Sequence, residues 1–481
     1  MYCARIQKHN LSNIAENNVL EAVYLGDPTE FNFDRIFRAY DIRGVFDEDL
    51  TDEVATRIGA AFATFLGKDK EVLVARDVRL SGEVLRKALV SGLLSGCDVT
   101  DIGIVPTPLV YFAINRLQKD AGIMITASHN PPEWNGFKAF GRKGCIYGKD
   151  MEKIKQIAKE VDLKRLGKKR GRLSSYKRVI QEYMDFVQSK IEIERNLKVV
   201  ADTANGTCGL VAPSLFKQLG CKILTLNQNP DGTFPAHLPE PKEETLGELK
   251  REVVKNKADF GVGYDGDGDR AVFVDEKGNV IPGDLTLLIF AKDVLQKSKG
   301  AKIVYELSCS MAVEEYIKEL GGIPIVERVG HTFIMDKMIE ENALFGGEKS
   351  SHFYFSECYG MDDAIFASLR MAEILSKSSE KLSEIVDSLP KYPSIYEKNF
   401  ECSDNLKFAV IEKLRVRFKD YGLNVLDIDG VKLLDKNGWV LLRPSNTEPV
   451  IRVSAEARTE EKLKELYEFA KKELNHVLKG G

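Results

Sequence analysis

Apolar positions of the chain fall into short runs that alternate with amphipathic stretches, and three segments repeat one order of elements. In the first, the run at 71–77 predicts a strand, Ser81-Gly82 predicts the start of a helix that ends near Gly96, and a second strand begins at 98–99. Residues 198–224 and 302–325 repeat the order strand, polar loop, helix, strand. Units of this kind, ~25 residues long, favour parallel pairing through a right-handed crossover. Three of them, far apart, predict three related α/β domains rather than a short-period solenoid.

Composition between these units predicts where the domains end. Residues 164–177 are dense in Lys, Arg and Gly and predict a linker near 165–175. A turn at 275–279 ends the second strand–loop–helix–strand segment. Strand-like runs at 439–443 and 450–453, followed by an amphipathic helix at 460–478, predict a small α+β domain at the end of the chain. The predicted parts are an N-terminal extension with one helix at 1–34, then domains at 35–168, 169–277, 278–390 and 391–481.

Charge and cysteine content narrow the class of protein. The chain has 481 residues and a net charge of −4, which argues against nucleic acid or an anionic membrane surface as the main partner. Its apolar runs are all shorter than the ~20 residues of a membrane span, and its first residues lack the apolar core of a signal peptide. The eight cysteines include no Cys-x-x-Cys pair, so neither a zinc site nor a disulfide framework is predicted. We expect a cytoplasmic, soluble protein, and the net charge leaves room for a local basic pocket that binds an anionic small molecule.

A polar loop after a buried strand offers the first candidate chemistry. The apolar run 122–125 predicts a strand that stops at Thr126, and Asn130-Pro131-Pro132 prevents both a longer strand and an immediate helix. Ser128 is therefore held on a stiff loop at a strand end, where α/β proteins place their reactive groups. The alternative interpretation is a purely structural turn.

The second candidate for chemistry is a set of three carboxylates at alternate positions, Asp265, Asp267 and Asp269. They supply hard oxygen ligands, and the intervening glycines let the backbone curl so that all three point at one centre. Without a cation they would repel one another and raise one another's pKa, so we predict a bound Mg²⁺. An acidic surface turn is disfavoured because a buried strand, 260–263, leads into the loop.

Two other acidic motifs fit this loop less well. An EF-hand needs glycine at its sixth position, where this chain has Arg270, and a helix afterwards, where this chain has the strand-like run 271–274. A haloacid-dehalogenase motif needs Thr or Val where Asp269 or Ala271 stands.

Further polar clusters follow later strands. His331 belongs to the cluster at 327–331, and Glu348 and Ser350 lie in a strand–turn at 345–352, where a plain turn is the alternative. An arginine with hydroxyls and backbone N–H groups on a tight loop forms a phosphate cradle, with a capped turn as the alternative. That cradle would consist of Arg443, Ser445, Asn446 and Thr447, with Arg452 after it.

These loops, in this order and together with Phe37–Gly44, which contains Arg43, resemble the α-D-phosphohexomutases of the phosphomannomutase/phosphoglucomutase type. The resemblance extends over residues 37 to 455. It implies an α/β fold of three related mixed-sheet α/β domains plus a C-terminal α+β domain around a central cleft, with one loop from each domain. Ser351 stands where many relatives carry glycine.

The resemblance implies catalytic roles for the first loops. Ser128 would carry the phosphoryl group and, once phosphorylated, would place an oxygen on the Mg²⁺ held by the three aspartates. Arg270 and Arg43 would stabilise the transferring group. Lys138 and His331 are the candidates for the general base, by family position. We do not expect His129 in this role, because neighbouring side chains in an extended loop point apart.

The later loops would bind the substrate. Glu348 and Ser350 would hydrogen-bond ring hydroxyls, and the loop from Arg443 to Thr447, with Arg452, would hold the phosphate. The implied reaction interconverts hexose 1-phosphate and hexose 6-phosphate of mannose or glucose through hexose 1,6-bisphosphate, which would also be the activator. A phosphoglucosamine mutase is the alternative within the family. A non-catalytic sugar-phosphate sensor is the alternative outside it, which the presence of Ser128 and all three aspartates disfavours.

Overall fold

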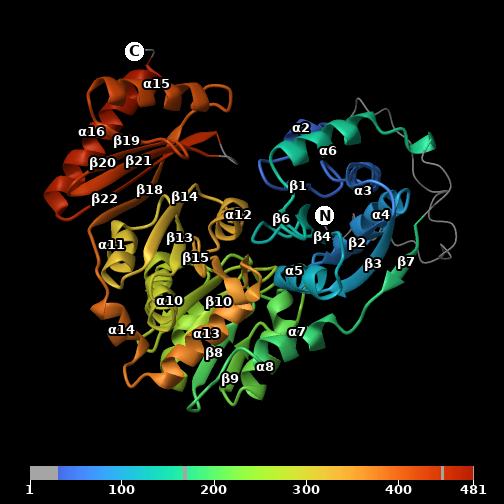
Figure 1. The fold of residues 1–481 in the computed structure, drawn as a ribbon, viewed down its shortest axis with the longest axis horizontal. Coiled ribbons are helices and arrows are strands. Elements are labelled where there is room, and N and C mark those ends of the chain that lie inside the picture. The colour runs from blue at the N-terminus through green and yellow to red at the C-terminus, as the bar shows by residue number, and fades with distance from the viewer. Residues whose placement is uncertain (1–30, 166–170, 446–448, 480–481) are drawn as a thin grey trace. The chain divides into compact units, whose positions relative to one another are not determined.

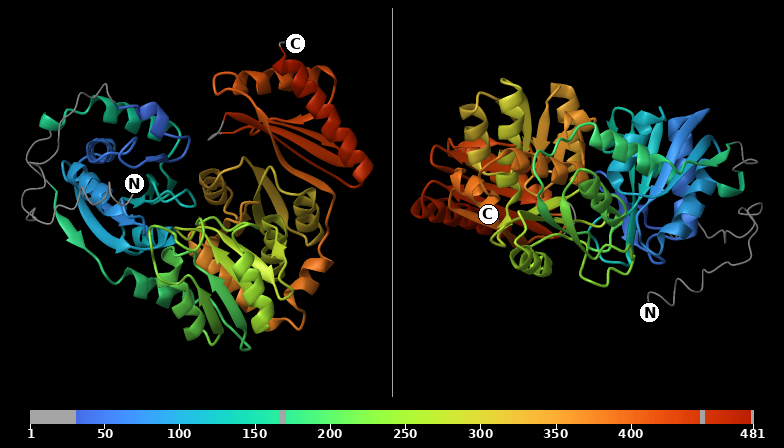
Figure 2. Two further views of the ribbon diagram at one scale, coloured as in Figure 1. Left: turned by 180° about the vertical axis from the view of Figure 1, so that it is seen from behind. Right: turned by 90° about the horizontal axis from the view of Figure 1, so that it is seen from below.

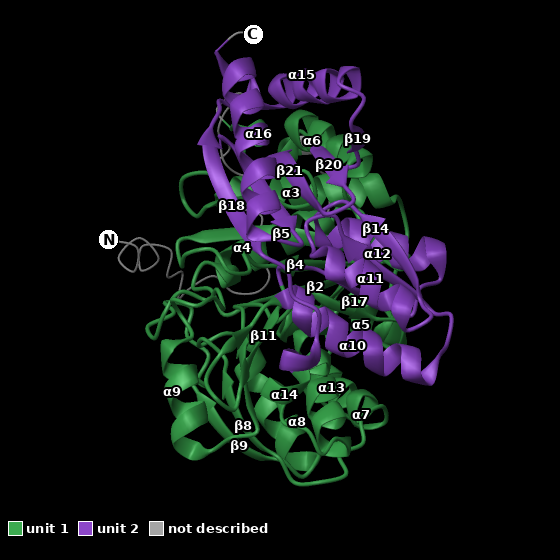
Figure 3. Cartoon of the chain, turned by 90° about the vertical axis from the view of Figure 1, so that its left-hand side faces the viewer, with its two compact units in different colours: residues 1–282, 351–385 green, residues 283–350, 386–481 purple. Residues whose placement is uncertain are grey.

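The structure is a computed structural model that describes residues 31–165, 171–445 and 449–479. They divide into two compact units (Figure 3). Unit 1 contains the chain up to Pro282 and residues 351–385, and unit 2 contains residues 283–350 and 386–481. The helix expected in the N-terminal extension lies mostly outside the described residues, which begin just before the short helix α2, Phe33–Ile36.

The first sheet of unit 1 has seven strands, with β6 paired to β5 beside the order β1-β5-β4-β2-β3-β7. Strands β4, β2, β3 and β7 are parallel, whereas β5 runs antiparallel to both β4 and β1. Helices α3 and α4 pack so closely that a Cβ on Gly59 would lie 2.1 Å from the Leu89 carbonyl oxygen. The elements are β1 Ile42–Val45, α3 Asp52–Leu66, β2 Lys70–Arg76, α4 Gly82–Leu93, β3 Cys97–Ile104, α5 Thr107–Arg116, β4 Ala121–Ile125, β5 Trp134–Gly141, β6 Gly144–Cys145, α6 Lys149–Glu160, η2 Leu163–Arg165 and β7 Leu173–Ser175.

The second sheet of unit 1 has the order β12-β11-β10-β8-β9. Strands β10, β8 and β9 are parallel, and β11 returns antiparallel to β10, so the loop between them projects from one end of the sheet. The elements are α7 Val179–Gln188, β8 Lys198–Asp202, η3 Thr207–Leu210, α8 Ala212–Gln218, β9 Lys222–Leu226, α9 Gly247–Asn256, β10 Phe260–Tyr264, β11 Ala271–Asp275 and β12 Val280–Ile281. Unit 1 also contains a later segment with β16 Phe353–Phe355, η4 Ser356–Cys358, β17 Met361–Asp362 and α13 Ala364–Lys377, whose helix contacts β11.

Unit 2 begins with three parallel strands in the order β14-β13-β15. Helix α10 packs against α11 and β15, and α12 contacts all three strands. The elements are α10 Gly283–Lys297, β13 Lys302–Glu306, α11 Met311–Glu319, β14 Ile323–Glu327, α12 His331–Glu341 and β15 Phe345–Gly347. Helix α14, Leu382–Ser388, spans the point at which the chain enters unit 2 for the second time.

The rest of unit 2 is an antiparallel sheet in the order β18-β22-β21-β20-β19. Helices α15 and α16 cover one of its faces (Figures 1 and 2). Buried apolar side chains of both helices and of the sheet form a single core. The elements are β18 Ser394–Glu401, α15 Lys407–Asp420, β19 Asn424–Leu426, β20 Val431–Asp435, β21 Gly438–Pro444, β22 Val450–Ala457 and α16 Glu460–Leu478.

The predicted fold class is confirmed: three α/β sheets with parallel strands precede a C-terminal α+β domain. Each predicted repeat pairs its two strands in parallel, as β2 with β3, β8 with β9 and β13 with β14. The linker predicted near 165–175 ends earlier than expected, because Leu173–Ser175 forms the edge strand β7, which pairs with β3. No helix among the described residues combines the length and the apolar composition that a membrane span requires.

Candidate active site

Ser128 lies on the connection between β4 and β5 and is almost completely buried. Its φ of 51° is in the left-handed region, which non-glycine residues rarely adopt. The hydroxyl donates a hydrogen bond to Oδ2 of Asp265 at 2.9 Å, and Oγ lies 2.9 Å from Nδ1 of His129. The expectation that the Ser128 and His129 side chains point apart is therefore wrong. It assumed an extended backbone, and the left-handed conformation of Ser128 brings the two groups together.

The acidic loop connects β10 to β11, and all three of its carboxylates are buried. Oδ1 of Asp265 accepts hydrogen bonds from the N–H groups of Gly268, Asp269 and Arg270, at 2.9, 3.1 and 3.2 Å. These bonds fold the loop around its first carboxylate. Position 266 has no room for a side chain, because a Cβ there would lie 2.7 Å from the Ser128 carbonyl oxygen. The serine loop, residues 126–133 between β4 and β5, is thus in direct contact with the backbone of the acidic loop.

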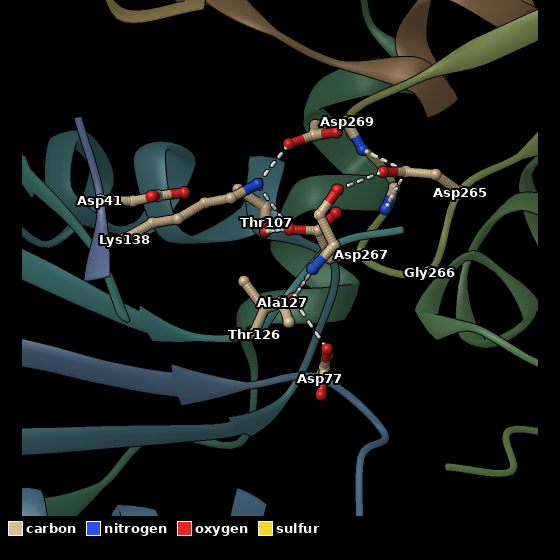
Figure 4. Close-up of polar contacts among 12 residues, drawn as sticks. Asp41, Asp77, Thr107, Thr126, Ala127, Lys138, Asp265, Gly266, Asp267 and Asp269 are labelled. Carbon is tan, nitrogen blue, oxygen red and sulfur yellow. Dashed lines mark hydrogen bonds and ion pairs between the residues drawn. The ribbon is translucent and has the colours of Figure 1, made fainter. Parts of the chain in front are cut away.

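Lys138 joins the two loops a second time (Figure 4). It lies on β5 opposite Met124, and its ammonium donates to Oδ2 of Asp267 at 2.8 Å and to Oδ2 of Asp269 at 2.6 Å. Thr107, the first residue of α5, donates to the same oxygen of Asp267 at 2.7 Å. The first sheet therefore supplies a buried cation and a hydroxyl to the carboxylates of the second.

Burial makes the charges of this cluster strongly interdependent. Burial and the neighbouring carboxylates of Asp269 and Asp267 raise the pKa of Asp265 well above its usual range. Burial also acts to raise the pKa of Asp269, but Lys138 in particular holds it well below its usual range. Burial alone would lower the pKa of Lys138, but the two carboxylates beside it raise this pKa above the ordinary value. Lys138 is accordingly an ammonium ion in this arrangement.

The acidic loop fits a divalent cation. One carboxylate oxygen from each aspartate lies within 4.8 Å of the others. Among the described residues, Oδ1 of Asp267 and Oδ1 of Asp269 are buried and have no hydrogen-bond partner. Buried carboxylate oxygens without donors are costly unless a cation or a proton compensates them, and Mg²⁺ prefers oxygen ligands of this type.

Two arginines flank the cluster within unit 1. Arg43 on β1 donates through Nε to Asp41 at 2.7 Å and through Nη1 to Oδ1 of Asn130 in the serine loop, also at 2.7 Å. Arg270, which ends the acidic loop, donates through Nε to Nε2 of His352 at 2.9 Å. The structure therefore brings Ser128, Lys138, the three aspartates, Arg270 and Arg43 together within unit 1.

His352 is a candidate that the sequence did not reveal. It is buried just before β16, and Nδ1 lies 2.8 Å from Oδ2 of Asp362, with Nε2 accepting from Arg270. With Arg270 as the donor to Nε2, the ring carries its proton on Nδ1, which faces Asp362. Burial acts to lower the pKa of His352, but the carboxylate of Asp269 and the hydrogen bond with Asp362 raise this pKa above its ordinary value. The sequence of 345–352 offers Glu348 and Ser350 as sugar-binding candidates. Nothing in the spacing of its residues indicates that the last one, His352, contacts the acidic loop.

In unit 2, the sugar-binding candidates lie at the end of β15. The Glu348 side chain is 2% exposed, and its Oε2 accepts a hydrogen bond from the N–H of Gly330 at 3.1 Å. This bond joins the loop at 345–352 to the start of α12, where His331 is buried as the first residue of the helix. Ser350 is exposed. Unit 2 therefore places His331 beside the loop that contains Glu348.

The phosphate-binding candidates lie on the antiparallel pair β21–β22. Arg443 and Arg452 are directly opposite one another, and Glu397 on β18 accepts from both, at 3.5 and 2.9 Å. The connecting loop is closed by a hydrogen bond from the Ser445 N–H to the Val450 carbonyl. Asn446 and Thr447 lie outside the described residues.

Comparison with known proteins identifies the family. Models of the four domains of phosphoglucomutase/phosphomannomutase match residues 34–165 (domain I), 181–278 (domain II), 282–392 (domain III) and 397–472 (the C-terminal domain). The chain belongs to the phosphoglucomutase/phosphomannomutase family. It is thus a phosphohexomutase, an isomerase that transfers a phosphoryl group.

Individual members of this family are similar over nearly the whole chain. A phosphoglucomutase/phosphomannomutase of Thermococcus kodakarensis is 38% identical over 93% of this chain and all of the relative. A probable phosphoglucosamine mutase of Methanothermobacter thermautotrophicus is also 38% identical, over 92% of this chain and 98% of the relative. The crystal structure of a phosphoglucomutase/phosphomannomutase family protein from Burkholderia thailandensis has a TM-score of 0.86 and 35% identity, with 94% of this chain and 99% of that chain covered.

Each segment matched by the phosphoglucomutase/phosphomannomutase models contains at least one candidate loop. Domain I contains Ser128 and Lys138, domain II contains the acidic loop, domain III contains Glu348, and the C-terminal domain contains Arg443. A relative of equal identity is a probable phosphoglucosamine mutase, so membership of the family does not define the sugar.

Proposed function

We propose that this phosphohexomutase interconverts the 1- and 6-phosphates of mannose or glucose, with Ser128 as the carrier of the phosphoryl group. The proposal rests chiefly on one observation: the Ser128 hydroxyl lies 2.9 Å from Asp265, in a buried cluster of three carboxylates and a lysine that two half-buried arginines flank. A nucleophile beside a cation site and fixed positive charges suits phosphoryl transfer, in which catalysis consists largely of positioning and charge stabilisation.

The residues around Ser128 would divide the work of the transfer. Asp265, Asp267, Asp269 and one oxygen of phosphorylated Ser128 would hold Mg²⁺, which would supply positive charge beside the transferring group. Arg270 and Arg43 would stabilise the oxygens of the transferring group. Asp267 and Asp269 keep Lys138 in its ammonium form. Lys138 would therefore supply a fixed positive charge, and it could act as the general base only after it had lost its proton. His331 is the other candidate for accepting the proton.

In the first half-reaction, the O–P bond at Ser128 breaks and a new O–P bond forms at the free hydroxyl of a hexose monophosphate. The sugar hydroxyl gives its proton to the general base, and Ser128 Oγ takes up a proton and regains its hydroxyl. The product is hexose 1,6-bisphosphate, which turns end for end and returns its other phosphoryl group to Ser128. Added bisphosphate would therefore act as an activator by loading the enzyme.

Unit 2 would hold the sugar phosphate. Glu348 and Ser350 are suited to vicinal hydroxyls, because a carboxylate accepts hydrogen bonds and a hydroxyl both donates and accepts. Arg443, Ser445, Asn446 and Thr447, with Arg452, would bind the phosphate that is not transferred. Glucosamine 1-phosphate is the alternative substrate, since one relative of equal identity is a probable phosphoglucosamine mutase. We expect the enzyme to be cytoplasmic.

The proposal is tested by Ser128→Ala and by side-by-side kinetics. We expect intact-mass measurement to find one phosphate on the wild-type protein after incubation with glucose 1,6-bisphosphate and none on Ser128→Ala. Turnover of mannose 1-phosphate and glucose 1-phosphate should fall by about three or more orders of magnitude in the variant, as for removal of a covalent nucleophile. Near-wild-type turnover by Ser128→Ala would exclude a phosphoserine carrier, and a clear preference for glucosamine 1-phosphate would replace the proposed sugar.

A further inference from the structure

The backbone of Ser128 is held at both of its polar groups. Its N–H donates to Oγ1 of Thr126 at 2.8 Å, and its carbonyl oxygen accepts from Nη2 of Arg79 at 2.9 Å. Thr126 and Arg79 in turn bind the same carboxylate, Asp77, which immediately follows β2. A left-handed conformation of a non-glycine residue persists where the surrounding structure imposes it, and here both ends of the residue are fixed.

Asp77 uses both of its oxygens for this purpose. Oδ2 accepts the Thr126 hydroxyl at 2.7 Å and Nε of Arg79 at 3.1 Å, and Oδ1 accepts the backbone N–H of Arg79 at 2.9 Å. Since the Thr126 hydroxyl donates to Asp77, its lone pairs face the Ser128 N–H. The Asp77 carboxylate thus orients both groups that hold the Ser128 backbone. These are the Thr126 hydroxyl, which accepts from the N–H, and the Arg79 guanidinium, which donates to the carbonyl oxygen.

Arg79 is 0% exposed and has a partner for each of its five side-chain N–H groups. One partner is Asp77, and the other four are backbone carbonyl oxygens: those of Ser128, Asn130 and Pro131 in the serine loop and that of Trp134 at the start of β5. A planar guanidinium with a rigid fork of donors can hold four carbonyls in fixed directions, whereas an ammonium has three donors. The whole serine loop is therefore folded over one buried cation.

A loop of the second sheet's domain covers this cation. The Phe234 ring lies over the Arg79 guanidinium, at 5.1 Å from its centroid. Gly232 comes so close that a Cβ on it would lie 2.3 Å from the Val78 carbonyl oxygen. Water is excluded from the arginine, which strengthens its hydrogen bonds to the loop.

We propose that Asp77, Thr126 and Arg79 form a positioning device that keeps Ser128 in its left-handed conformation and returns Oγ to the same place after each phosphoryl transfer. None of the three takes part in the chemistry. This inference rests on the proposed function, because the device matters only if Ser128 carries the phosphoryl group. If Ser128 relaxed to negative φ, Oγ would turn away from Asp265, and the P–O bond would form at the wrong distance from the acidic loop.

Thr126→Val and Thr126→Ser test the device with matched changes. Valine keeps the shape of threonine but loses the hydroxyl, whereas serine keeps the hydroxyl. Incubation of dephosphorylated protein with glucose 1,6-bisphosphate, followed by intact mass against time, should show phosphorylation of Thr126→Val slowed by about 10- to 100-fold, the usual effect of a small misplacement. We expect kcat to fall with it, KM for the hexose phosphate to stay unchanged, and Thr126→Ser to recover most of both rates.

Thr100→Val controls for loss of a threonine hydroxyl in the same sheet, because Thr100 on β3 contacts Ser174 at the surface and is distant in sequence from the serine loop. It should phosphorylate at the wild-type rate. Arg79→Lys should also be phosphorylated slowly. If this variant does not fold, the phosphorylation rate of Thr126→Val still tests the positioning device.

The possible failures are distinguishable. Wild-type protein that never acquires a phosphate would refute the proposed function itself. Phosphorylation of wild type and of folded Thr126→Val at the same rate would overturn the positioning device alone, as would a crystal structure of Thr126→Val with Ser128 still at positive φ.

Discussion

Arg270 donates a hydrogen bond from Nε to Nε2 of His352 at 2.9 Å, and the opposite nitrogen of the ring lies 2.8 Å from Asp362. The guanidinium at the end of the acidic loop is thus oriented by a buried imidazole, which is itself oriented by a buried carboxylate. Such chains fix both the tautomer and the direction of the ring.

From this chain we predict that His352→Ala lowers turnover more than it lowers stability. Loss of the acceptor frees Arg270 to adopt other rotamers, so kcat should fall by about 10- to 1000-fold, as for loss of one oriented charge-stabilising donor. Steady-state kinetics and thermal unfolding would measure the two effects. His476→Ala, an exposed histidine on α16, should leave both unchanged. Full activity of His352→Ala would show that Arg270 needs no such support.

Gly266→Ala should inactivate the enzyme although it adds a single methyl group. The new Cβ would lie 2.7 Å from the Ser128 carbonyl oxygen and 3.1 Å from Cβ of Pro239, so the acidic loop and the serine loop must separate. We expect kcat to fall by about 100-fold or more, in line with displacement of catalytic groups by about 1 Å. Gly247→Ala at the start of α9 is the control, because its nearest neighbour would be 3.6 Å away.

Chelation should abolish activity, and Mg²⁺ should restore it. Added Mg²⁺ should also stabilise the folded protein, by about 2.7 kcal/mol at a concentration a hundredfold above its Kd. Calorimetry with and without Mg²⁺ would measure this shift. Asp267→Asn should lose the shift together with the activity, because it removes a carboxylate from the cluster. Full turnover in excess chelator would contradict the assignment of the acidic loop to a cation.

The contribution of His237 to stability should depend on pH. Its Nε2 lies 3.1 Å from Oδ2 of Asp202 and its Nδ1 lies 2.8 Å from the Leu238 carbonyl oxygen, so the imidazolium can donate to both. The hydrogen bond to Asp202 raises the pKa of His237 above its ordinary value of 6.5. A raised pKa adds stability that is complete below the unfolded-state pKa and is lost as pH rises through the folded-state pKa.

His237→Gln should therefore lower the melting temperature most at pH 5.5 to 6.5 and least above pH 8. The difference in unfolding free energy should be on the order of 1 kcal/mol, because the pair is partly exposed to solvent. Melting curves of both proteins from pH 5.5 to 9 would test this. A gap that stays constant over that range would show that His237 contributes packing alone.

Strong periodic patterns predicted their elements well. The helix predicted at 460–478 has those same bounds as α16, because its apolar stripe is regular and Thr459 caps it by accepting from the N–H of Lys462. The single helix expected between the two strands of the repeat at 198–224 is in fact two elements, η3 and α8. Pro213, in the first turn of α8, favours a new helix start over the continuation of an old one.

Contacts that depend on rare backbone conformations or on distant segments could not be predicted. The approach of His129 to Ser128 follows from one positive φ, which no residue type at that position signals. The approach of His352 to Arg270 joins residues 82 positions apart. By contrast, the carboxylates at 265, 267 and 269 could be assigned to one centre because a short Gly-rich loop brings them together whatever the rest of the chain does.

Lys138 reaches the carboxylates because it lies on a particular face of β5, opposite Met124. Side chains alternate along a strand, so an insertion or deletion of one residue between 126 and 133 that shifted the register would turn Phe137 or Ala139 toward them instead. A change of two residues would restore the face but move the ammonium by about 7 Å along the strand. In evolution this hairpin can therefore accept substitutions far more readily than changes in length.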